Sequence, residues 1–421
     1  SDRIALAADG QFAGRKITMP RRAVLTALEG GGWQLAPTQI NFADGGAIAS
    51  GSFGSEQTDL EVKLARMPLS LVDVVMSDLG LGGTISGVVD IQSVRGGLPT
   101  GTARVKVNQL TRSGLVLSSK PVDLSLLARL EENSLEARAV LANEDIQRGR
   151  IQAYINGLPR SGDLTQRLRA GQLDAQLRYQ GAAESLWRLA AIDAFDLTGP
   201  ASIAANATGT LANPRVRGTV RSEDLRVRSS LSGTDIRDVT VRGTFAGSRL
   251  NLTRFAGSTE NGGTVTGSGI VDLEGLGERV EGRFTEIRGP TLDLRASARN
   301  ASLLRANGLT AAVTGPLRIV SNGLGGTIAG RVRINRASWR LASAAEDMRL
   351  PVIATREINA PSDRAPVVAP GRPWRYLINA SGNSRIDVDG MGLESEWGAD
   401  IILRGTTDDP RIGGSAQVVR G

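Results

Sequence analysis

The side chains that most enzymes use for catalysis are scarce in this sequence. The chain contains no histidine and no cysteine, which removes the usual imidazole bases, thiolate nucleophiles and zinc ligands. Three carboxylate pairs remain as candidates: Glu131 with Glu132, Asp387 with Asp389, and Asp408 with Asp409. The second pair resembles the start of a calcium-binding loop, but the later ligands of such a loop are absent. We therefore expect these carboxylates in turns or on solvated strand faces.

The short motifs of common enzyme families are also missing. The sequence has no Gly-x-Ser-x-Gly elbow, no phosphate loop that ends in Gly-Lys-Ser/Thr, and no Gly-x-Gly-x-x-Gly. A serine triad would lack its ordinary base. The sequence thus predicts a protein that is not an enzyme and that needs no cofactor or metal.

The charge distribution argues against nucleic-acid binding. The formal net charge is +7, from 50 basic and 43 acidic residues, and only four of the basic residues are lysine. The arginines are spread along the chain between acidic residues, whereas nucleic-acid-binding proteins concentrate positive charge beside aromatic side chains. No window reaches the ~18 apolar residues of a membrane span, and the first residues carry no signal peptide. We interpret the chain as a piece of a longer protein.

Apolar and polar residues alternate along much of the chain, and this alternation indicates which secondary structure holds the side chains. Leu60, Val62 and Leu64 alternate with acidic and basic neighbours, and Leu173, Ala175 and Leu177 follow the same rule. A period of two is typical of strands with one dry and one wet face. Turn residues interrupt the pattern about every ten positions. The sequence therefore predicts an all-β fold.

The dry face of these strands is the candidate functional surface. Its expected groove-lining residues share the inward side of the alternation in several predicted strands. They are Val216, Val220, Val239, Val241, Phe245, Leu250, Leu252, Val332, Ile334, Ile386 and Val388.

Short helices and one irregular stretch divide the predicted sheet. Helical spacing of apolar residues occurs near 68–78, 182–194 and 300–306. Five prolines make 351–373 a predicted surface loop or linker. We expect a repetitive β region over 1–350, this linker, and a further β region over 374–421.

Internal repetition is the strongest signal in the chain. Gly-Gly-Thr-(Ile/Val)-x-Gly occurs at 82–87, 262–267 and 325–330, and Gly-Thr-x-x-x-Pro-Arg-(Val/Ile)-x-Gly occurs at 209–218 and 405–414. The glycine pair can supply a turn with positive φ from which the next strand follows at once. The proline is expected in the connection, where no ladder donor is lost. We interpret the repeats as structural and place the function in the surface that they generate.

These boxes and the final stretch together resemble the TamB family, within the AsmA-like group. The resemblance rests on 387–397 (Asp-Val-Asp-Gly-Met-Gly-Leu-Glu-Ser-Glu-Trp), 401–406 (Ile-Ile-Leu-Arg-Gly-Thr), 410–414 (Pro-Arg-Ile-Gly-Gly), and the segment 309–334. The resemblance covers about 182–421. Before residue 182 the chain shares only the general character of the family's sequences. The sequence lacks the N-terminal anchor of the family and stops where the family continues, so 374–421 is expected to be the truncated start of the C-terminal domain.

The resemblance implies a fold, a location and partners. The family is anchored in the inner membrane and spans the periplasm, and its elongated antiparallel sheet is rolled into an open trough with an apolar lumen. Its partner is the outer-membrane barrel TamA. The implied role is to move phospholipid between membranes, or to assist the assembly of autotransporters and other outer-membrane proteins.

Physical reasoning leaves two further function classes open. At about 4.8 Å per strand, a sheet of this many strands must elongate, and an exposed apolar face of that size would bind a guest or aggregate. An open trough leaves the face to acyl chains or unfolded protein. A β-helical passenger or adhesin would fill its own interior, and so would a structural spacer.

Overall fold

The computed structural model of the 421-residue chain describes residues 3–12, 15–29, 31–54, 56–71, 81–94, 97–112, 121–143, 146–187, 196–229, 232–275, 279–280, 286–306, 308–341, 372–407 and 409–421. They are nearly all β, a long sequential antiparallel strand ladder with two short α-helices. The chain divides into two compact units. Unit 1 contains Ser1–Gln180, Ala204–Val216 and Ile358–Ala369, and unit 2 contains Gly181–Ile203, Arg217–Glu357 and Pro370–Gly421.

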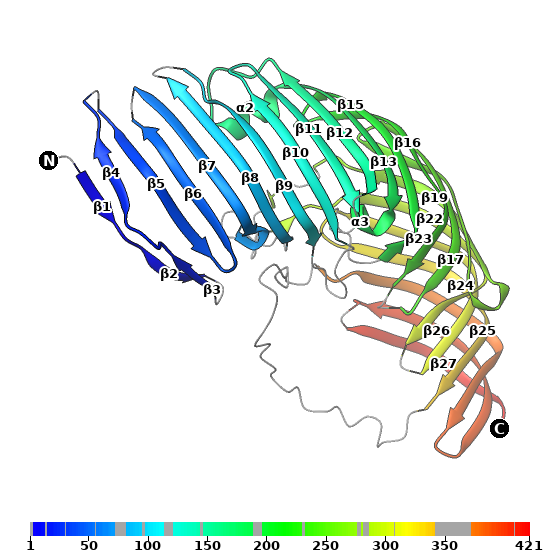
Figure 1. The fold of residues 1–421 in the computed structure, drawn as a ribbon. Coiled ribbons are helices and arrows are strands. Elements are labelled where there is room, and N and C mark those ends of the chain that lie inside the picture. Colours follow the sequence, from blue (N-terminus) through cyan, green and yellow to red (C-terminus); the bar gives the residue numbers. More distant parts are fainter. Residues whose placement is uncertain are drawn as a thin grey trace. The chain divides into compact units, whose positions relative to one another are not determined.

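Unit 1 is built from strands that pair mainly with their neighbours in sequence (Figure 1). The strands are β1 (Arg3–Leu6), β2 (Asp9–Phe12), β3 (Arg15–Thr18), β4 (Ala23–Ala27), β5 (Trp33–Phe42), β6 (Gly45–Phe53), β7 (Gln57–Pro68), β8 (Leu81–Val94), β9 (Thr100–Arg112), β10 (Val122–Leu130), β11 (Ser134–Asn143), β12 (Ile146–Asn156) and β13 (Gln172–Ala182). From β4 to β13 each strand is antiparallel to the next. β1 pairs with β4, and β3 pairs with both β2 and β5.

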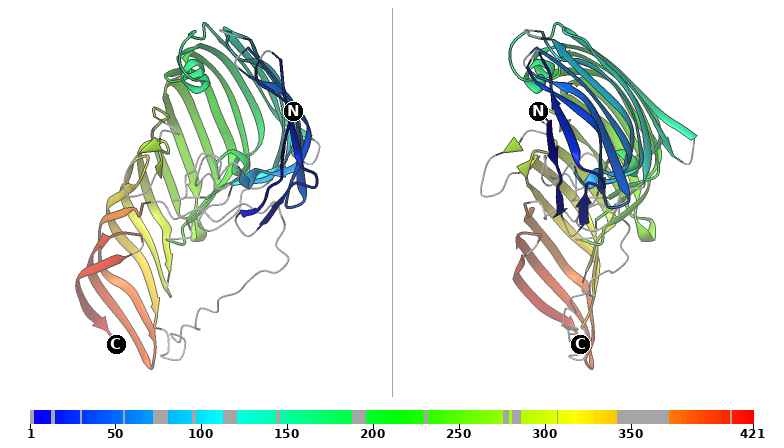
Figure 2. Two further views of the ribbon diagram at one scale, coloured as in Figure 1. Left: turned by 90° about the vertical axis from the view of Figure 1, so that its left-hand side faces the viewer. Right: turned by 60° about the vertical axis from the view of Figure 1, so that its left-hand side comes forward.

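Unit 2 repeats this arrangement with longer strands (Figure 2). It contains β14 (Asp196–Thr198), β17 (Asp235–Gly247), β18 (Arg249–Ser258), β19 (Thr264–Asp272), β22 (Thr291–Ala306), β23 (Leu309–Asn322), β24 (Gly326–Arg340), β25 (Arg375–Gly390), β26 (Leu393–Gly405) and β27 (Pro410–Arg420). A separate small hairpin pairs β20 (Arg279–Val280) with β21 (Glu286–Ile287). β15 (Pro200–Thr210) and β16 (Pro214–Arg228) contribute residues to both units.

The pairing of β24 with β25 breaks the antiparallel order. β24 and β25 run parallel, with Thr327 beside Arg375 and Arg340 beside Asp389. A parallel pair needs a long crossover connection rather than a tight turn. The connection here is 341–374, which contains the predicted linker 351–373. Its length is therefore a requirement of the topology, although 351–371 themselves lie outside the described residues.

Two short helices coincide with the start of predicted ones, and a third prediction is wrong. The 3-10 helix η1 (Leu69–Leu71) begins the predicted helix 68–78, and α3 (Ala183–Trp187) begins the predicted helix 182–194. The rest of both ranges lies outside the described residues. The range 300–306 is part of β22 instead. The helix α2 (Leu164–Ala170), which the sequence analysis missed, is capped by Asp163, whose carboxylate accepts from the Gln166 N–H at 2.9 Å.

The wrong helix has a physical cause, a β-bulge in β22. The pairing with β23 shifts between Ala298 and Ala301, and Asn300 between them adopts a positive φ of 48°. The bulge keeps Ala298 and Ala301 on one face although they are three residues apart. The pairing shifts again between Ser302 and Leu304, so Ala301 and Leu304 are also three residues apart on one face. Apolar spacing of three also occurs in helices, so the pattern at 300–306 resembles that of a helix.

Of the two repeated motifs, the proline box forms the same turn at both places. The glycine-pair box occupies different places in the strands. In the proline box, Gly209 is the next-to-last residue of β15 and Gly405 the last of β26, with φ of 98° and 81°. The threonine that follows each glycine accepts a bond on its hydroxyl from the residue before proline, at 3.1 Å and 3.2 Å. The prolines are the first residues of β16 and β27 rather than part of the connection. The glycine-pair boxes differ: 262–263 precedes β19 as predicted, whereas Gly83 lies inside β8, opposite a bulge in β9.

Candidate functional site: the apolar sheet faces

The antiparallel register of unit 2 aligns apolar residues into rows that run across its strands. Residues directly opposite each other project from the same face of a sheet. One row contains Gly243, Leu252, Gly269, Leu294, Ile319, Ile328 and Tyr376. Its neighbour contains Val241, Phe255, Gly267, Ala296, Leu317, Gly330, Ile378 and Leu403. No position in either row is charged, and burial raises the pKa of the Tyr376 hydroxyl.

At the β17–β22 end of the first row, glycine alternates with leucine, so large side chains lie beside glycine there. Leu252 has Gly243 and Gly269 as its two cross-strand partners. A Cβ placed on Gly243 would lie 3.2 Å from the Leu252 Cδ2 atom. The glycines therefore leave the room that the leucine occupies, and the face is packed laterally within a single layer.

The middle of this face is only partly buried. Leu252, Phe255, Leu317 and Ile378 are partly buried hydrophobics that pack against a core of Val239, Val241 and other residues. Val239 is fully buried, with 0% of its surface exposed. The buried end of the face includes Ala183 of α3, whose neighbour Glu184 accepts from the Gly199 N–H at 3.1 Å. Burial continues along the ladder beside this middle part, because Val265 of β19, Ala298 of β22 and Val332 of β24 are also buried. The face therefore has a buried strip next to the two partly buried rows.

The structure places most of the predicted groove residues on this face. Val239, Val241 and Val332 belong to one buried cluster, against which Leu252 packs, while Ile334, Ile386 and Val388 form a second. Phe245 and Leu250 are direct cross-strand partners on the same face. Val220 lies on β16 of unit 2, whereas Val216 belongs to unit 1 and is not in these clusters. Their role as groove lining remains a prediction.

Sequence reasoning missed several members of the rows. Leu294, Ile319, Ile328 and Ile378 alternate as clearly as the chosen residues. Phe255 was hidden because a register shift separates it from Leu252 by three positions. The usable signal was an apolar spacing of three inside an otherwise alternating strand.

The opposite face of unit 2 is polar and carries ion pairs. Arg318 binds Asp293 through two nitrogens, at 2.9 Å and 3.0 Å, and its guanidinium lowers the pKa of the Asp293 carboxyl. Arg249 pairs with Asp272 at 2.9 Å. Exposed ion pairs stabilise a fold by only about 0.2–1 kcal/mol each. This face is therefore the solvated side of the sheet.

Unit 1 has an apolar face of the same kind. One of its rows contains Leu64, Gly87, Val105, Leu126, Ala139, Ile151 and Leu177. Only Ala139 in this row is buried among its non-glycine members whose exposure is described. At one end, Ile155, Leu158 and Leu173 form a buried cluster that Leu168 of α2 helps to cover. Arg167 of α2 is itself buried and donates to the Pro159 and Glu132 carbonyls at 2.7 Å and 2.5 Å.

The described residues hold no group of three or more acidic side chains that could bind a metal ion. None of the helices in the described part of the chain has the length and hydropathy that a membrane crossing requires.

Comparisons with known proteins agree with the ladder of unit 2. Residues 253–421 match the family model of the TamB C-terminal domain. This range begins within β18 and includes every later strand through β27. No curated protein and no solved structure matches the chain. Residues 253–421 are therefore a TamB C-terminal domain.

Proposed function

We propose that the apolar sheet face of each unit forms an open trough along which phospholipid acyl chains move through the periplasm. The observation that carries this proposal is the partial exposure of large apolar residues in the middle of the sheet. Leu317 and Ile378, for example, have paired strands on both sides and are still only partly buried. An apolar surface of this extent binds a guest or aggregates.

Acyl chains fit this face better than an unfolded polypeptide does. The two rows of unit 2 contain no charged side chain, and the backbone groups of their strands are used in the ladder. A polypeptide on such a face would bury N–H and C=O groups without partners, which costs several kcal/mol per group. A methylene group needs only apolar contact and gains about 0.8 kcal/mol on burial.

The remaining parts of the proposal follow from the TamB family. The protein would act without catalysis as a component of the translocation and assembly module. It would work in the periplasm from an inner-membrane anchor, with the outer-membrane barrel TamA as its partner. Assistance to outer-membrane protein assembly would then follow from the lipid supply or from direct contact with client strands.

A filled-core adhesin or spacer is the competing function, and Val239 favours it locally. This valine is closed to solvent, and Val265, Ala298 and Val332 on later strands of the ladder are buried as well. The two partly exposed rows beside these residues favour the trough, because a filled core would bury them as completely as Val239.

A pair of adjacent residues on β23 tests the trough. Ile319 lies in the apolar row, whereas Val320 is 38% exposed on the polar face beside Asp293. Both side chains are apolar and β-branched, so they differ mainly in the face they occupy. A photo-crosslinking amino acid at 319 should capture phospholipid in cells, and one at 320 should not.

Each outcome of this experiment has a defined meaning. Phospholipid at 319 alone supports the conduit. Polypeptide adducts at 319 would replace lipid by client protein as cargo. Equal capture at both positions, or none at 319, would refute the assignment of the faces.

A further inference from the structure

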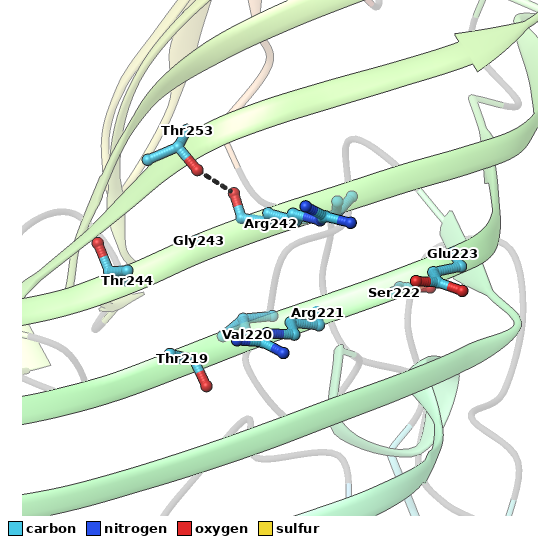
Figure 3. Close-up of a pocket in the computed structure, with 10 residues that line it drawn as sticks. Thr219, Val220, Arg221, Ser222, Glu223, Arg242, Gly243, Thr244 and Thr253 are labelled. Carbon is cyan, nitrogen blue, oxygen red and sulfur yellow. Dashed lines mark hydrogen bonds between the residues drawn. The ribbon is translucent and has the colours of Figure 1, made fainter.

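A depression on the polar face of β16, β17 and β18 has a basic lining that the trough does not use. Its volume is about 320 Å³, and its lining residues are Thr219, Val220, Arg221, Ser222, Glu223, Val241, Arg242, Gly243, Thr244 and Thr253 (Figure 3). Arg221, Arg242, Thr244 and Thr253 are exposed, while the alternating Ser222, Val241 and Gly243 are buried. The exposed side chains therefore form the walls on the solvated side of the sheet.

A bulge shapes this depression. Arg242 is opposite Arg254 and Gly243 is opposite Leu252, so Thr253 is an extra residue in β18. The Thr253 hydroxyl donates to the Arg242 carbonyl at 3.1 Å (Figure 3). A bulge bends its strand and re-aims the nearby side chains. The hydroxyl bond fixes this local geometry next to the Arg242 guanidinium.

The arginines of the depression lack the carboxylate partners that other arginines of the unit have. Arg249 and Arg318 pair with Asp272 and Asp293. Within the described part of the chain, neither Arg221 nor Arg242 forms an ion pair with a carboxylate. Arg242 instead has a second guanidinium directly opposite, and like charges in that position are destabilising. The excess positive charge is therefore uncompensated by the protein itself.

We propose that this depression binds a phosphate group, with Arg221 and Arg242 as its cationic ligands. Two guanidinium groups can each present paired N–H donors to phosphate oxygens. The Thr219 and Thr244 hydroxyls add donors, so the site offers more than the two oxygens of a carboxylate could accept. Glu223 is the one acidic lining residue and opposes the bound anion. The site lies on the face opposite the proposed trough and does not depend on it.

The first test measures binding of glycerol 3-phosphate to the purified protein by calorimetry. The double variant Arg221→Gln/Arg242→Gln should bind about tenfold more weakly or worse, since charge-assisted bonds are lost. Glu223→Gln should bind more tightly. The matched control is Arg331→Gln/Arg333→Gln, which removes two exposed arginines of β24 and should bind like the wild type.

A second arm identifies the source of the phosphate. The same variants are tested by flotation with phosphatidylcholine vesicles, with and without phosphatidylglycerol. The site is assigned to a lipid headgroup if the wild type binds phosphatidylglycerol vesicles but not glycerol 3-phosphate. In that case only the Arg221→Gln/Arg242→Gln variant should lose the vesicle binding. Binding of neither probe by the wild type overturns the proposal. Equal loss in the β24 control also overturns it, because general charge would then explain the binding. Lipid capture at Ile319 should be unchanged in all variants.

Discussion

Replacing Leu252 with arginine places a charge on the accessible part of the apolar face. Leu252 is partly buried between Gly243 and Gly269. Full burial of a leucine stabilises a protein by about 1.5–3 kcal/mol, so the loss at this partly buried site is about 1–2 kcal/mol. No cross-strand side chain confines the longer arginine, and its head group can reach water from an open trough. We expect the fold to persist.

Transport should respond much more strongly than folding. A guanidinium that displaces contact with about four methylene groups removes about 3 kcal/mol of guest binding at that point. This corresponds to a factor of more than about one hundred in occupancy. Lipid capture at Ile319 in the Leu252→Arg background, and complementation of growth in cells, measure this effect.

Val239→Arg is the matched comparison, because Val239 is 0% exposed on the same face. An unpaired charge enclosed there costs several kcal/mol, so urea denaturation should show a large loss of stability or no folded protein. Similar destabilisation by both variants would mean that the face is filled throughout and would refute the trough. Intact folding together with intact lipid capture in Leu252→Arg would show that Leu252 does not line the path.

Three further changes test the fold of the two units. The Arg226 guanidinium holds the pKa of the Asp235 carboxyl below its usual range, so this stabilisation is present above about pH 4 and is lost as the pH falls through the folded-state value. Asp235→Asn should lose about 1–3 kcal/mol at neutral pH and show a flatter stability curve below about pH 4. Gly87→Ala should cost about 1–3 kcal/mol, because φ is 148° and the new Cβ would lie 2.1 Å from a carbonyl oxygen of the next strand; Gly413→Ala, with nothing within 4 Å, should be nearly neutral by thermal unfolding. Thr314→Val removes the acceptor of a bulge N–H at 2.9 Å and should cost about 0.5–1.5 kcal/mol. Equal losses for this change and for Thr310→Val, at an exposed position, would show that the acceptor is unimportant.

The fold class could be predicted because alternation is a local property of a strand. Leu60, Val62 and Leu64 reveal one dry face without reference to any partner strand, and the structure places them in one strand, β7. The repeat at 209–218 and 405–414 likewise encodes a turn that is closed by its own threonine. The parallel pairing of β24 with β25 could not be read in this way. It depends on which strand the chain meets after the connection 341–374.

The sequence could predict which residues belong to the apolar face, but not the register that sets them side by side. Alternation identifies which residues of one strand face inward, but not which residue of the next strand stands beside each of them. The gap that glycine leaves beside Leu252 is a property of three strands together. The depression near Arg242 also escaped notice, since its walls come from three strands and a bulge. Neither feature has a signature within a single segment.

The bulges explain how one apolar face stays continuous over such long strands. Arg66, Gln109 and Asn300 each adopt a positive φ at or beside a register shift. The N–H of each donates to a side-chain oxygen of another strand, from Ser86, Asp123 and Thr314 respectively, at 2.9 Å in every case. A bulge leaves its extra residue out of the ladder, and each of these hydrogen bonds gives its N–H a partner and contributes about 0.5–1.5 kcal/mol.

A bulge whose N–H donates to a side-chain oxygen occurs at three places in the chain. This recurrence indicates that the register shifts are a regular part of the ladder. Strands twist against one another, and the twist accumulates over many strands. A bulge bends its own strand and increases the local twist, while the spacing of three across it returns the next apolar residue to the same face. Leu64 and Met67 show this in β7, as Ala298 and Ala301 do in β22.

Removing a bulge by deleting Asn300 should therefore invert the facing of the rest of β22, which would put Leu304 on the polar side and Arg305 on the apolar side. Because a one-residue slip moves every later side chain to the other face, the deletion should destabilise unit 2 far more than Asn300→Gly, which keeps the extra residue and relieves its positive φ. Equal stability of the two variants in urea denaturation would contradict this account of how the apolar face is kept in phase.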